Sequence, residues 1–228
     1  MSEGDDREGC AVVTGGTRGI GAAVVRRLRA DGWDAVALGR TGGDVSCDVG
    51  DPEAVAAAFD EIEAQRGPVL VLVNNAGVRR DGLTIRMSPD DWQTVIETNL
   101  SGAFHCTRRA LGSMLKARWG RIVNVSSVAA VHANPGQANY AASKAGLLAL
   151  TGTVAREMAR KGITCNAVTP GVVETDMTAD IVDDLVPLVP AGRVGQPEDV
   201  AAAISFLCSE EAAYVNGATL AVDGALAA

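Results

Sequence analysis

The stretch "CAVVTGGTRGIG", residues 10–21, carries the pattern that decides the fold. Its first five residues are apolar or β-branched and predict a buried strand, and the residues after Gly19 predict a helix. Gly15, Gly19 and Gly21 stand at the junction, where glycine allows a tight turn and lets the backbone come close to a ligand. The N–H groups at the start of such a helix bind phosphate. The order strand, glycine turn, helix therefore predicts a dinucleotide-binding βα unit.

Strand-like and helix-like patterns alternate along the rest of the chain. Several strand candidates are apolar at every position, as in parallel strands covered on both faces, and three helices are expected to open with proline followed by acids. The sequence predicts strands at 10–14, 34–39, 44–48, 69–73, 121–125, 163–168 and 218–222, and helices at about 19–31, 52–65, 89–117, 139–160 and 197–208. This alternation predicts an α/β fold, a single-domain Rossmann-type doubly wound parallel β-sheet flanked by helices on both faces. Only residues 40–43 separate the second and third strands, so a turn is expected there in place of a helix.

Length and charge narrow the class of protein. The 228 residues suffice for one domain, expected at residues 10–228 after a flexible N-terminal arm at residues 1–9. A net charge of −8 argues against a nucleic-acid-binding protein, which needs a basic surface. No apolar run is long enough to predict a membrane span, and the polar, acidic first residues do not resemble a targeting segment. A cytoplasmic protein is the expectation.

Cysteine and histidine give no sign of a metal site. The five cysteines are scattered singly, most of them inside apolar runs, and are expected to be reduced core residues. His105 and His132 have no acid at a catalytic spacing, and Tyr214 has no lysine at helical spacing, so structural roles are expected for all three.

A tyrosine and a lysine in "NYAASKAG", residues 139–146, form the most unusual local pattern. Lys144 follows Tyr140 by four positions, which places both side chains on one face of a helix. An ammonium group so close to a phenol predicts a tyrosine pKa below the usual value of about 10. Such a tyrosine would exchange protons easily.

Two arginines predict which dinucleotide the glycine loop accepts. An acid at the end of the second strand would bind the ribose 2′-hydroxyl of NAD, but Arg40 stands there, and Arg18 lies in the loop itself. Guanidinium groups bind a 2′-phosphate well, so NADPH/NADP+ is favoured. Asp44 lies nearby but comes after the turn. The alternative interpretation is that Arg18 and Arg40 are solvated surface residues with no ligand.

Six motifs in order resemble the short-chain dehydrogenase/reductase family over nearly the whole chain. They are TGGTRGIG (14–21), NNAG (74–77), Asn99, GRIVNVSS (120–127), YAASK (140–144) and PGVVETDM (170–177). Within the family, QANYAASKAG (137–146), GVVETDM (171–177), VPAGRVGQPEDVA (189–201) and IETNLSGAF (96–104) are most similar to the 3-oxoacyl-[acyl-carrier-protein] reductase branch. That branch reduces 3-oxoacyl thioesters with NADPH.

The resemblance implies roles for individual residues. Tyr140 would be the general acid that protonates the substrate oxygen, Ser127 (thirteen residues before it) would hold that oxygen, Lys144 would tune the phenol and hold the nicotinamide ribose, and Asn99 would anchor a water in a proton relay. Ser126 is left to local hydrogen bonding. Asp48 and Val49 would hold the adenine, and Val173 and Thr175 the nicotinamide carboxamide. The full set of expected cofactor-binding residues is Gly15, Gly16, Thr17, Arg18, Gly19, Ile20, Gly21, Arg40, Asp48, Val49, Asn75, Ala76, Gly77, Tyr140, Lys144, Pro170, Gly171, Val173 and Thr175.

Partner and assembly follow from the same resemblance. The substrate would be a small-molecule or carrier-bound ketone, with acyl-carrier protein as a partner and Arg118 and Lys161 as basic residues flanking the site mouth. A homotetramer is expected, with a dimer as the second choice. Three other functions stay open: a ketoreductase of polyketide or other secondary metabolism, a secondary-alcohol dehydrogenase acting on a free small ketone, and a non-catalytic NADP sensor on the same fold.

Overall fold

A computed structural model of the chain describes residues 9–175 and 182–228, without the side chains of residues 182 and 183. The expected N-terminal arm therefore lies outside the described residues apart from Gly9, as do Asp176 and Met177 of the last motif. No helix in the described part of the chain combines the length and the apolar character that a membrane crossing needs.

One seven-stranded parallel sheet forms the centre of the molecule, in the order β3-β2-β1-β4-β5-β6-β7. The strands are β1 (Cys10–Thr14), β2 (Asp34–Gly39), β3 (Val45–Ser46), β4 (Val69–Asn74), β5 (Gly120–Val125), β6 (Ile163–Pro170) and β7 (Thr219–Val222). Seven strands at the expected places confirm the predicted sheet, although β3 is only two residues long. The strand order reverses between β1 and β4, and the crevice at such a reversal is where open α/β sheets bind ligands.

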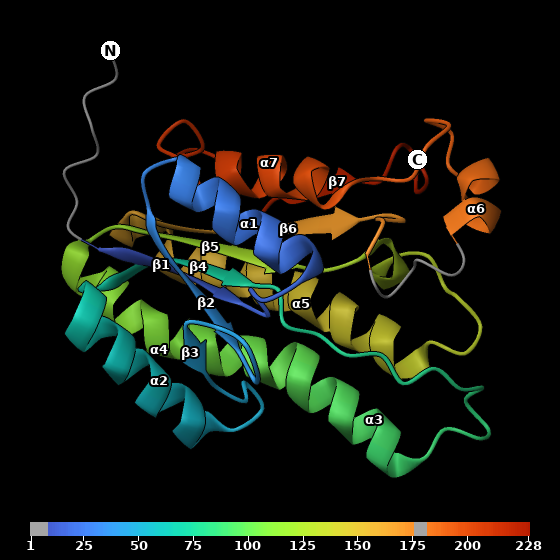
Figure 1. Ribbon diagram of the computed structural model, residues 1–228, viewed down its shortest axis with the longest axis horizontal. Helices are drawn as coiled ribbons and strands as arrows, with labels where there is room; N and C mark the ends of the chain where they lie inside the picture. Colours follow the sequence, from blue (N-terminus) through green and yellow to red (C-terminus); the bar gives the residue numbers. More distant parts are fainter. Residues whose placement is uncertain (1–8, 176–181) are drawn as a thin grey trace.

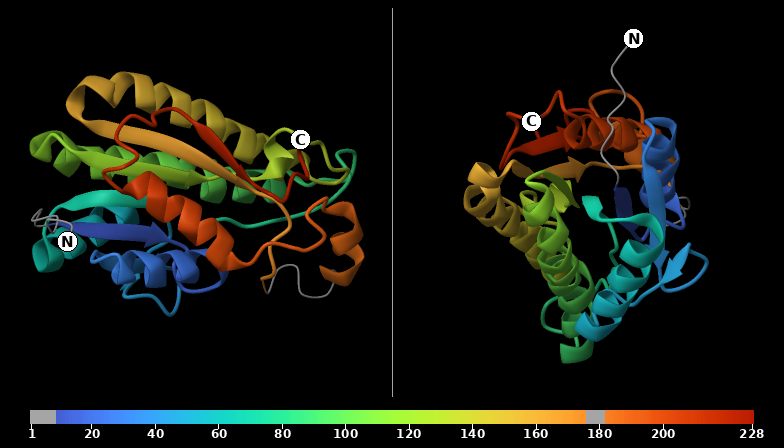
Figure 2. Two further views of the ribbon diagram at one scale, coloured as in Figure 1. Left: turned by 90° about the horizontal axis from the view of Figure 1, so that it is seen from above. Right: turned by 90° about the vertical axis from the view of Figure 1, so that its left-hand side faces the viewer.

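Helices cover both faces of the sheet, as predicted (Figures 1 and 2). One face packs against α1 (Gly19–Ala30) and α7 (Pro197–Cys208). The other packs against α2 (Pro52–Arg66), α4 (Gly102–Ala117) and α5 (Ala138–Met158). Successive residues of β1 point to opposite faces of the sheet. Val12 packs in the core under α2, α4 and α5, and Val13 packs in the core under α1 and α7. Shorter segments are α3 (Pro89–Ile96), α6 (Val182–Leu185), η1 (Glu97–Ser101), η2 (Val128–Ala130), η3 (Ala159–Lys161) and η5 (Val186–Leu188).

The helical run predicted at 89–117 is confirmed, but one part of it is a π-helix and not an α-helix. A five-residue π-helix, η1, separates α3 from α4. A π-turn inserts one extra residue into the backbone spiral and is frequent at functional sites. Asn99 lies within it and is 1% exposed, so the interruption turns this polar side chain toward the interior.

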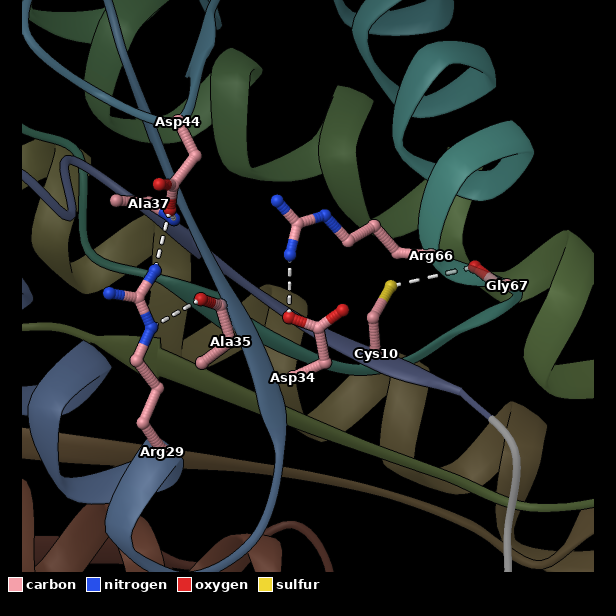
Figure 3. A network of polar contacts seen from close by, with 8 residues as sticks. All are labelled: Cys10, Arg29, Asp34, Ala35, Ala37, Asp44, Arg66 and Gly67. Carbon is pink, nitrogen blue, oxygen red and sulfur yellow. Dashed lines mark hydrogen bonds and ion pairs between the residues drawn. The ribbon is translucent and has the colours of Figure 1, made fainter.

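The short connection between β2 and β3 is held by one carboxylate. Asp44 accepts hydrogen bonds at 2.8 Å from the backbone N–H of Ala37 and from the guanidinium of Arg29, as Figure 3 shows. In the same view Arg66, the last residue of α2, forms an ion pair at 2.8 Å with Asp34, the first residue of β2. The turn expected in place of a helix is thus confirmed, and Asp44 explains how so short a connection is stabilised.

All five cysteines are buried free thiols, as expected: Cys10, Cys47, Cys106, Cys165 and Cys208. Burial is the first cause of their raised pKa values, which reach about 11 for Cys47 and about 12 for Cys10. Protonated thiols of this kind behave as small apolar residues and are poor nucleophiles.

Candidate active site

The predicted site residues come together at the carboxyl edge of the sheet. Thr14 ends β1, Asn74 ends β4, Ser126 follows β5 and Pro170 ends β6. These four positions are far apart in the sequence, but parallel strands bring their carboxyl ends to one edge. The site therefore straddles the reversal in strand order between β1 and β4.

The glycine loop has the geometry of a phosphate-binding turn. Gly15 and Gly19 have φ values of +63° and +52°, in the left-handed region that favours glycine. An ideal Cβ on Gly21 would lie 2.1 Å from the Gly15 carbonyl oxygen, so only glycine fits there. The first turn of α1 contains no acid and no side-chain cap, which leaves its N–H groups for an anion. The loop therefore fits a dinucleotide pyrophosphate.

Neighbouring segments hold this loop in place. The side-chain amide of Asn75 donates to the carbonyls of Thr14 and Gly15 at 3.0 and 3.1 Å, and Thr14 Oγ1 accepts the N–H groups of Asn75 and Ala76 at 3.0 Å. Gly16 donates to the Leu38 carbonyl at 3.3 Å. Of the other loop residues, Thr17 is exposed and touches the Gly39 position, and Ile20 packs against the core shared by α1 and α7.

The two arginines expected at the ribose are open to ligands. Arg18 and Arg40 are exposed, and neither forms an ion pair with a residue that the structure describes. Asp44, the acid nearest in sequence, is already bound to Arg29 and to backbone. The end of β2 thus offers positive charge rather than a free carboxylate.

The residues expected at the adenine follow β3. The Asp48 carboxylate accepts the N–H of Gly50 at 3.0 Å, and the side chain is exposed. Val49 is buried, and its carbonyl lies 3.3 Å from Nδ1 of His105. This contact gives His105 a structural partner of the kind expected for it.

Tyr140 and Lys144 lie on one face of α5 beside the end of β5. Lys144 is 3% exposed, donates from Nζ to the Val125 carbonyl at 2.8 Å, and lies 5.6 Å from the centre of the Tyr140 ring. Ser126 donates to the Lys144 carbonyl at 2.8 Å, which confirms its local role. Ser127 hydrogen-bonds Tyr140, and its Oγ also accepts the N–H of Ala129 at 3.1 Å. The serine, tyrosine and lysine expected to act together therefore do meet.

The predicted direction of the tyrosine pKa shift is wrong for this structure. Burial raises the pKa of Tyr140, and the opposing effects come from the Ser127 hydrogen bond and the charge of Arg79 rather than from Lys144. Burial also lowers the pKa of Lys144 to about 8. The phenol is thus kept protonated at neutral pH, which suits a proton donor.

The π-helix places Asn99 next to this cluster. Its amide accepts the N–H of Val78 at 2.8 Å and donates to the Val78 carbonyl and to Ser143 Oγ, both at 3.1 Å. An ideal Cβ on Gly77 would lie 3.4 Å from Asn99 Oδ1 and 3.6 Å from Lys144 Nζ. Asn99, Gly77 and Lys144 are therefore close neighbours.

The last motif reaches the glycine loop from the other side. Pro170 ends β6, and Gly171 donates to the Val222 carbonyl at 3.1 Å and fits closely against Asp223. Val173 is buried and bridges to Gly195. An ideal Cβ on Gly19 would lie 3.3 Å from the Thr175 methyl group, so residues 171–175 and the start of α1 face each other.

Two residues expected at the site mouth lie elsewhere. Arg118 ends α4 just before β5, and Lys161 precedes β6, so both are at the amino edge of the sheet, opposite the site. They line a surface depression together with Arg160 and Gly162. The expectation that they flank the mouth of their own subunit's site is therefore wrong.

A charged cluster beside Tyr140 was not predicted from the sequence. Arg79 forms an ion pair with Asp81, which also accepts from Gln137 at 3.2 Å, and the charges of Arg79 and Asp81 both act on the Tyr140 phenol. The signal that would have found this pair is position, because Arg79 and Asp81 lie two and four residues beyond NNAG, in the segment that leaves the carboxyl end of β4.

Comparison with known proteins agrees with this geometry. A family model described as enoyl-(acyl carrier protein) reductase matches residues 15–226. The chain belongs to the short-chain dehydrogenase/reductase family. It is 42% identical to the 3-oxoacyl-[acyl-carrier-protein] reductase FabG of Salmonella typhimurium and to that of Escherichia coli K12, covering 95% of this chain and 96% of each relative. It is 43% identical to the 3-oxoacyl-[acyl-carrier-protein] reductase MabA of Mycobacterium avium, over 94% of this chain and 88% of the relative. Members of this family are nicotinamide-dependent oxidoreductases, which is the chemistry that the glycine loop and the tyrosine suggest.

The low pKa of buried Lys144 predicts a pH-dependent stability difference. The folded chain releases this proton near pH 8, whereas the unfolded chain holds it to about pH 10.5. Between these values the unfolded state binds more protons, so this site makes the folded state more stable as the pH rises. The unfolding free energy of the unaltered protein minus that of Lys144→Met, measured by urea titration, should rise from pH 8 to pH 10 and be flat below pH 7.

Lys161→Met, which also removes one positive charge, is the matched control for net-charge effects. A difference for Lys144→Met that did not change over this range would mean that the folded protein does not depress this lysine's pKa.

Proposed function

We propose that the protein reduces 3-oxoacyl thioesters, carried by acyl-carrier protein, to 3-hydroxyacyl thioesters with NADPH. The observation that carries this proposal is the meeting of Ser127, Tyr140 and Lys144 at the carboxyl edge of the sheet, beside a glycine loop that fits a pyrophosphate. Relatives named for this reaction match nearly the full length of the chain and support the substrate class.

The residues present fit NADPH. The N–H groups of the loop from Gly15 to Gly21 would hold the pyrophosphate, and Arg18 and Arg40 would bind the 2′-phosphate. Asp48 and Val49 would border the adenine, Asn75 to Gly77 the ribose and pyrophosphate, and residues 170–175 the carboxamide. Lys144 would reach the nicotinamide ribose from the tyrosine side.

The chain's own residues account for the proton transfer. A nicotinamide held by these residues would supply the hydride for the C3 carbonyl carbon, and the electron pair of the C=O double bond would move to oxygen. Tyr140 donates its phenolic proton to that oxygen, and Ser127 holds the oxygen against the phenol. Lys144 stabilises the phenolate that remains, and the Asn99 amide, beside Gly77, borders the path by which water returns a proton.

Other reactions fit this site less well. The description of the family model names an enoyl reductase, which reduces C=C rather than C=O. Ser127 and Tyr140 interact with each other and would together hold a carbonyl oxygen, which favours reduction of C=O. A polyketide ketoreductase or a secondary-alcohol dehydrogenase would use the same cluster. A non-catalytic sensor would need the glycine loop alone, so the assembled cluster argues against it.

Assembly and location are part of the proposal. The α5 residues Ala141, Ala145, Leu148 and Ala149 are at least partly exposed, and β7 is an edge strand with an exposed face. Small side chains on a long helix and an uncovered edge strand support a homotetramer with isologous contacts. Five protonated thiols support the cytoplasm, where thiols stay reduced.

Tyr140→Phe is the central test of the reaction. The variant should fold and bind NADPH, but its turnover of acetoacetyl thioester should fall by about 10²–10⁴-fold, because a positioned general acid is lost. NADPH oxidation at 340 nm measures the rate. Tyr214→Phe, at a fully exposed tyrosine, should keep normal turnover. Near-normal turnover of Tyr140→Phe would assign the proton to another group, and oxidation with crotonyl but not acetoacetyl thioester would make the protein an enoyl reductase.

Arg40→Asp tests the cofactor. The unaltered protein should have a higher kcat/KM with NADPH than with NADH, and the substitution should narrow or invert this preference by replacing the positive charge with a repelling one. Arg86→Asp makes the same change of charge at another exposed position and should leave the preference in place. Equal kcat/KM for the two cofactors in the unaltered protein would contradict the proposal.

The mass in solution tests the assembly. Light scattering coupled to size exclusion, at micromolar concentration, should give four times the 23.4 kDa chain mass. Twice that mass would replace the tetramer with a dimer, and a monomeric mass would contradict both.

A further inference from the structure

The segment that follows NNAG is fastened to the start of α5 beside Tyr140. Val78 is held through both its N–H and its carbonyl by the amide of Asn99, at 2.8 and 3.1 Å. The Arg80 carbonyl accepts from the side chain of Asn139 at 2.9 Å, and Asn139 directly precedes Tyr140. Figure 1 shows this segment, between β4 and α3, passing along the start of α5. Arg79 therefore sits between two anchored residues.

The neighbours of Arg79 orient its side chain but accept hydrogen bonds from only part of its guanidinium group. One Nη pairs with Asp81, whose carboxylate is itself held by Gln137 from the turn before α5. In the described part of the chain, the other N–H groups of this guanidinium have no acceptor. The side chain is 32% exposed, and its charge acts on the Tyr140 phenol. Unused donors next to the proposed proton donor point to a ligand atom.

A 3-oxoacyl group offers such an atom. Only one methylene separates its C3 carbonyl, which Ser127 and Tyr140 would hold, from its C1 carbonyl. When the C3 oxygen lies against the phenol, the C1 oxygen must lie close by. A guanidinium has donors in a fixed planar arrangement, and a hydrogen bond from a charged donor is stronger than one from a neutral donor.

We propose that Arg79 is a specificity-determining substrate-binding residue, which donates a hydrogen bond to the C1 carbonyl oxygen of the 3-oxoacyl substrate. The inference rests on the proposed reduction of 3-oxoacyl thioesters. It explains how one site selects a compound with two carbonyls over an isolated ketone, which lacks the second acceptor. Asp81 and Gln137 position the guanidinium for this contact.

The test compares two substrates in the full-length protein with NADPH: acetoacetyl thioester of N-acetylcysteamine, with a C1 carbonyl, and cyclohexanone, without one. Arg79→Met should lower kcat/KM for the thioester by about ten- to a hundredfold, mainly through KM, because one charged hydrogen bond is lost. Its kcat/KM for cyclohexanone should stay within about twofold of the unaltered protein's. Arg79→Lys, which keeps a charged donor, should recover part of the loss on the thioester.

Arg80→Met is the matched control, because it makes the same replacement at the adjacent arginine, whose side chain faces Asp91 instead. This variant should have the same kcat/KM as the unaltered protein for both substrates. Equal losses on both substrates in Arg79→Met would mean that Arg79 acts through Tyr140 or through folding, and no loss on either would mean that it has no role; both results overturn the inference. An unaltered protein that reduces cyclohexanone but not the thioester would instead overturn the proposed function.

Discussion

The site depends on one constraint. The ammonium group of Lys144 must stay charged although it has almost no access to water. Lys144 is 3% exposed, and burial lowers its pKa to about 8, so it still holds its proton over most of the neutral range. The Val125 carbonyl, 2.8 Å from Nζ, offsets part of the loss of hydration. Gly77 lies beside the ammonium group, and Ser126 donates a hydrogen bond to the backbone of the helix that carries it. The residues nearest Lys144 thus stabilise its charged form and fix its position.

The parallel sheet supplies the second requirement, which is that distant segments meet at one edge. Four of the six motifs predicted from the sequence include the carboxyl end of a strand, and the parallel topology brings these ends to one edge, where the helices that carry Asn99 and Tyr140 also lie. This is why the strands, the flanking helices and the cluster of Ser127, Tyr140 and Lys144 could be predicted from apolar periodicity and motif order. Proline followed by acids predicted the starts of α2 and α3 correctly, and the structure adds that the side chains of Asp51 and Ser88 cap these two helices.

The features that the sequence predicted wrongly or did not reveal have physical causes. Residues 89–117 have a helical pattern throughout, and a π-turn differs from an α-turn in hydrogen bonding rather than in composition, so η1 could not be seen. The charge of Lys144 predicted a lowered tyrosine pKa, but the depth of burial, which opposes it, is a property of the assembled fold. Arg118 and Lys161 were assigned to the mouth by resemblance, yet residues that precede strands lie at the opposite edge. Arg79 was missed because it is two positions beyond a motif, where periodicity carries no information.

The buried cysteines have a practical consequence. All five thiols are buried and protonated at neutral pH, so alkylating reagents have no ready target on the folded chain. A single cysteine introduced on the surface would therefore be the preferred attachment point for a fluorophore or spin label. Distances between subunits, or between the glycine loop and the start of α5, could then be followed spectroscopically without first removing the native cysteines and disturbing the core that they fill.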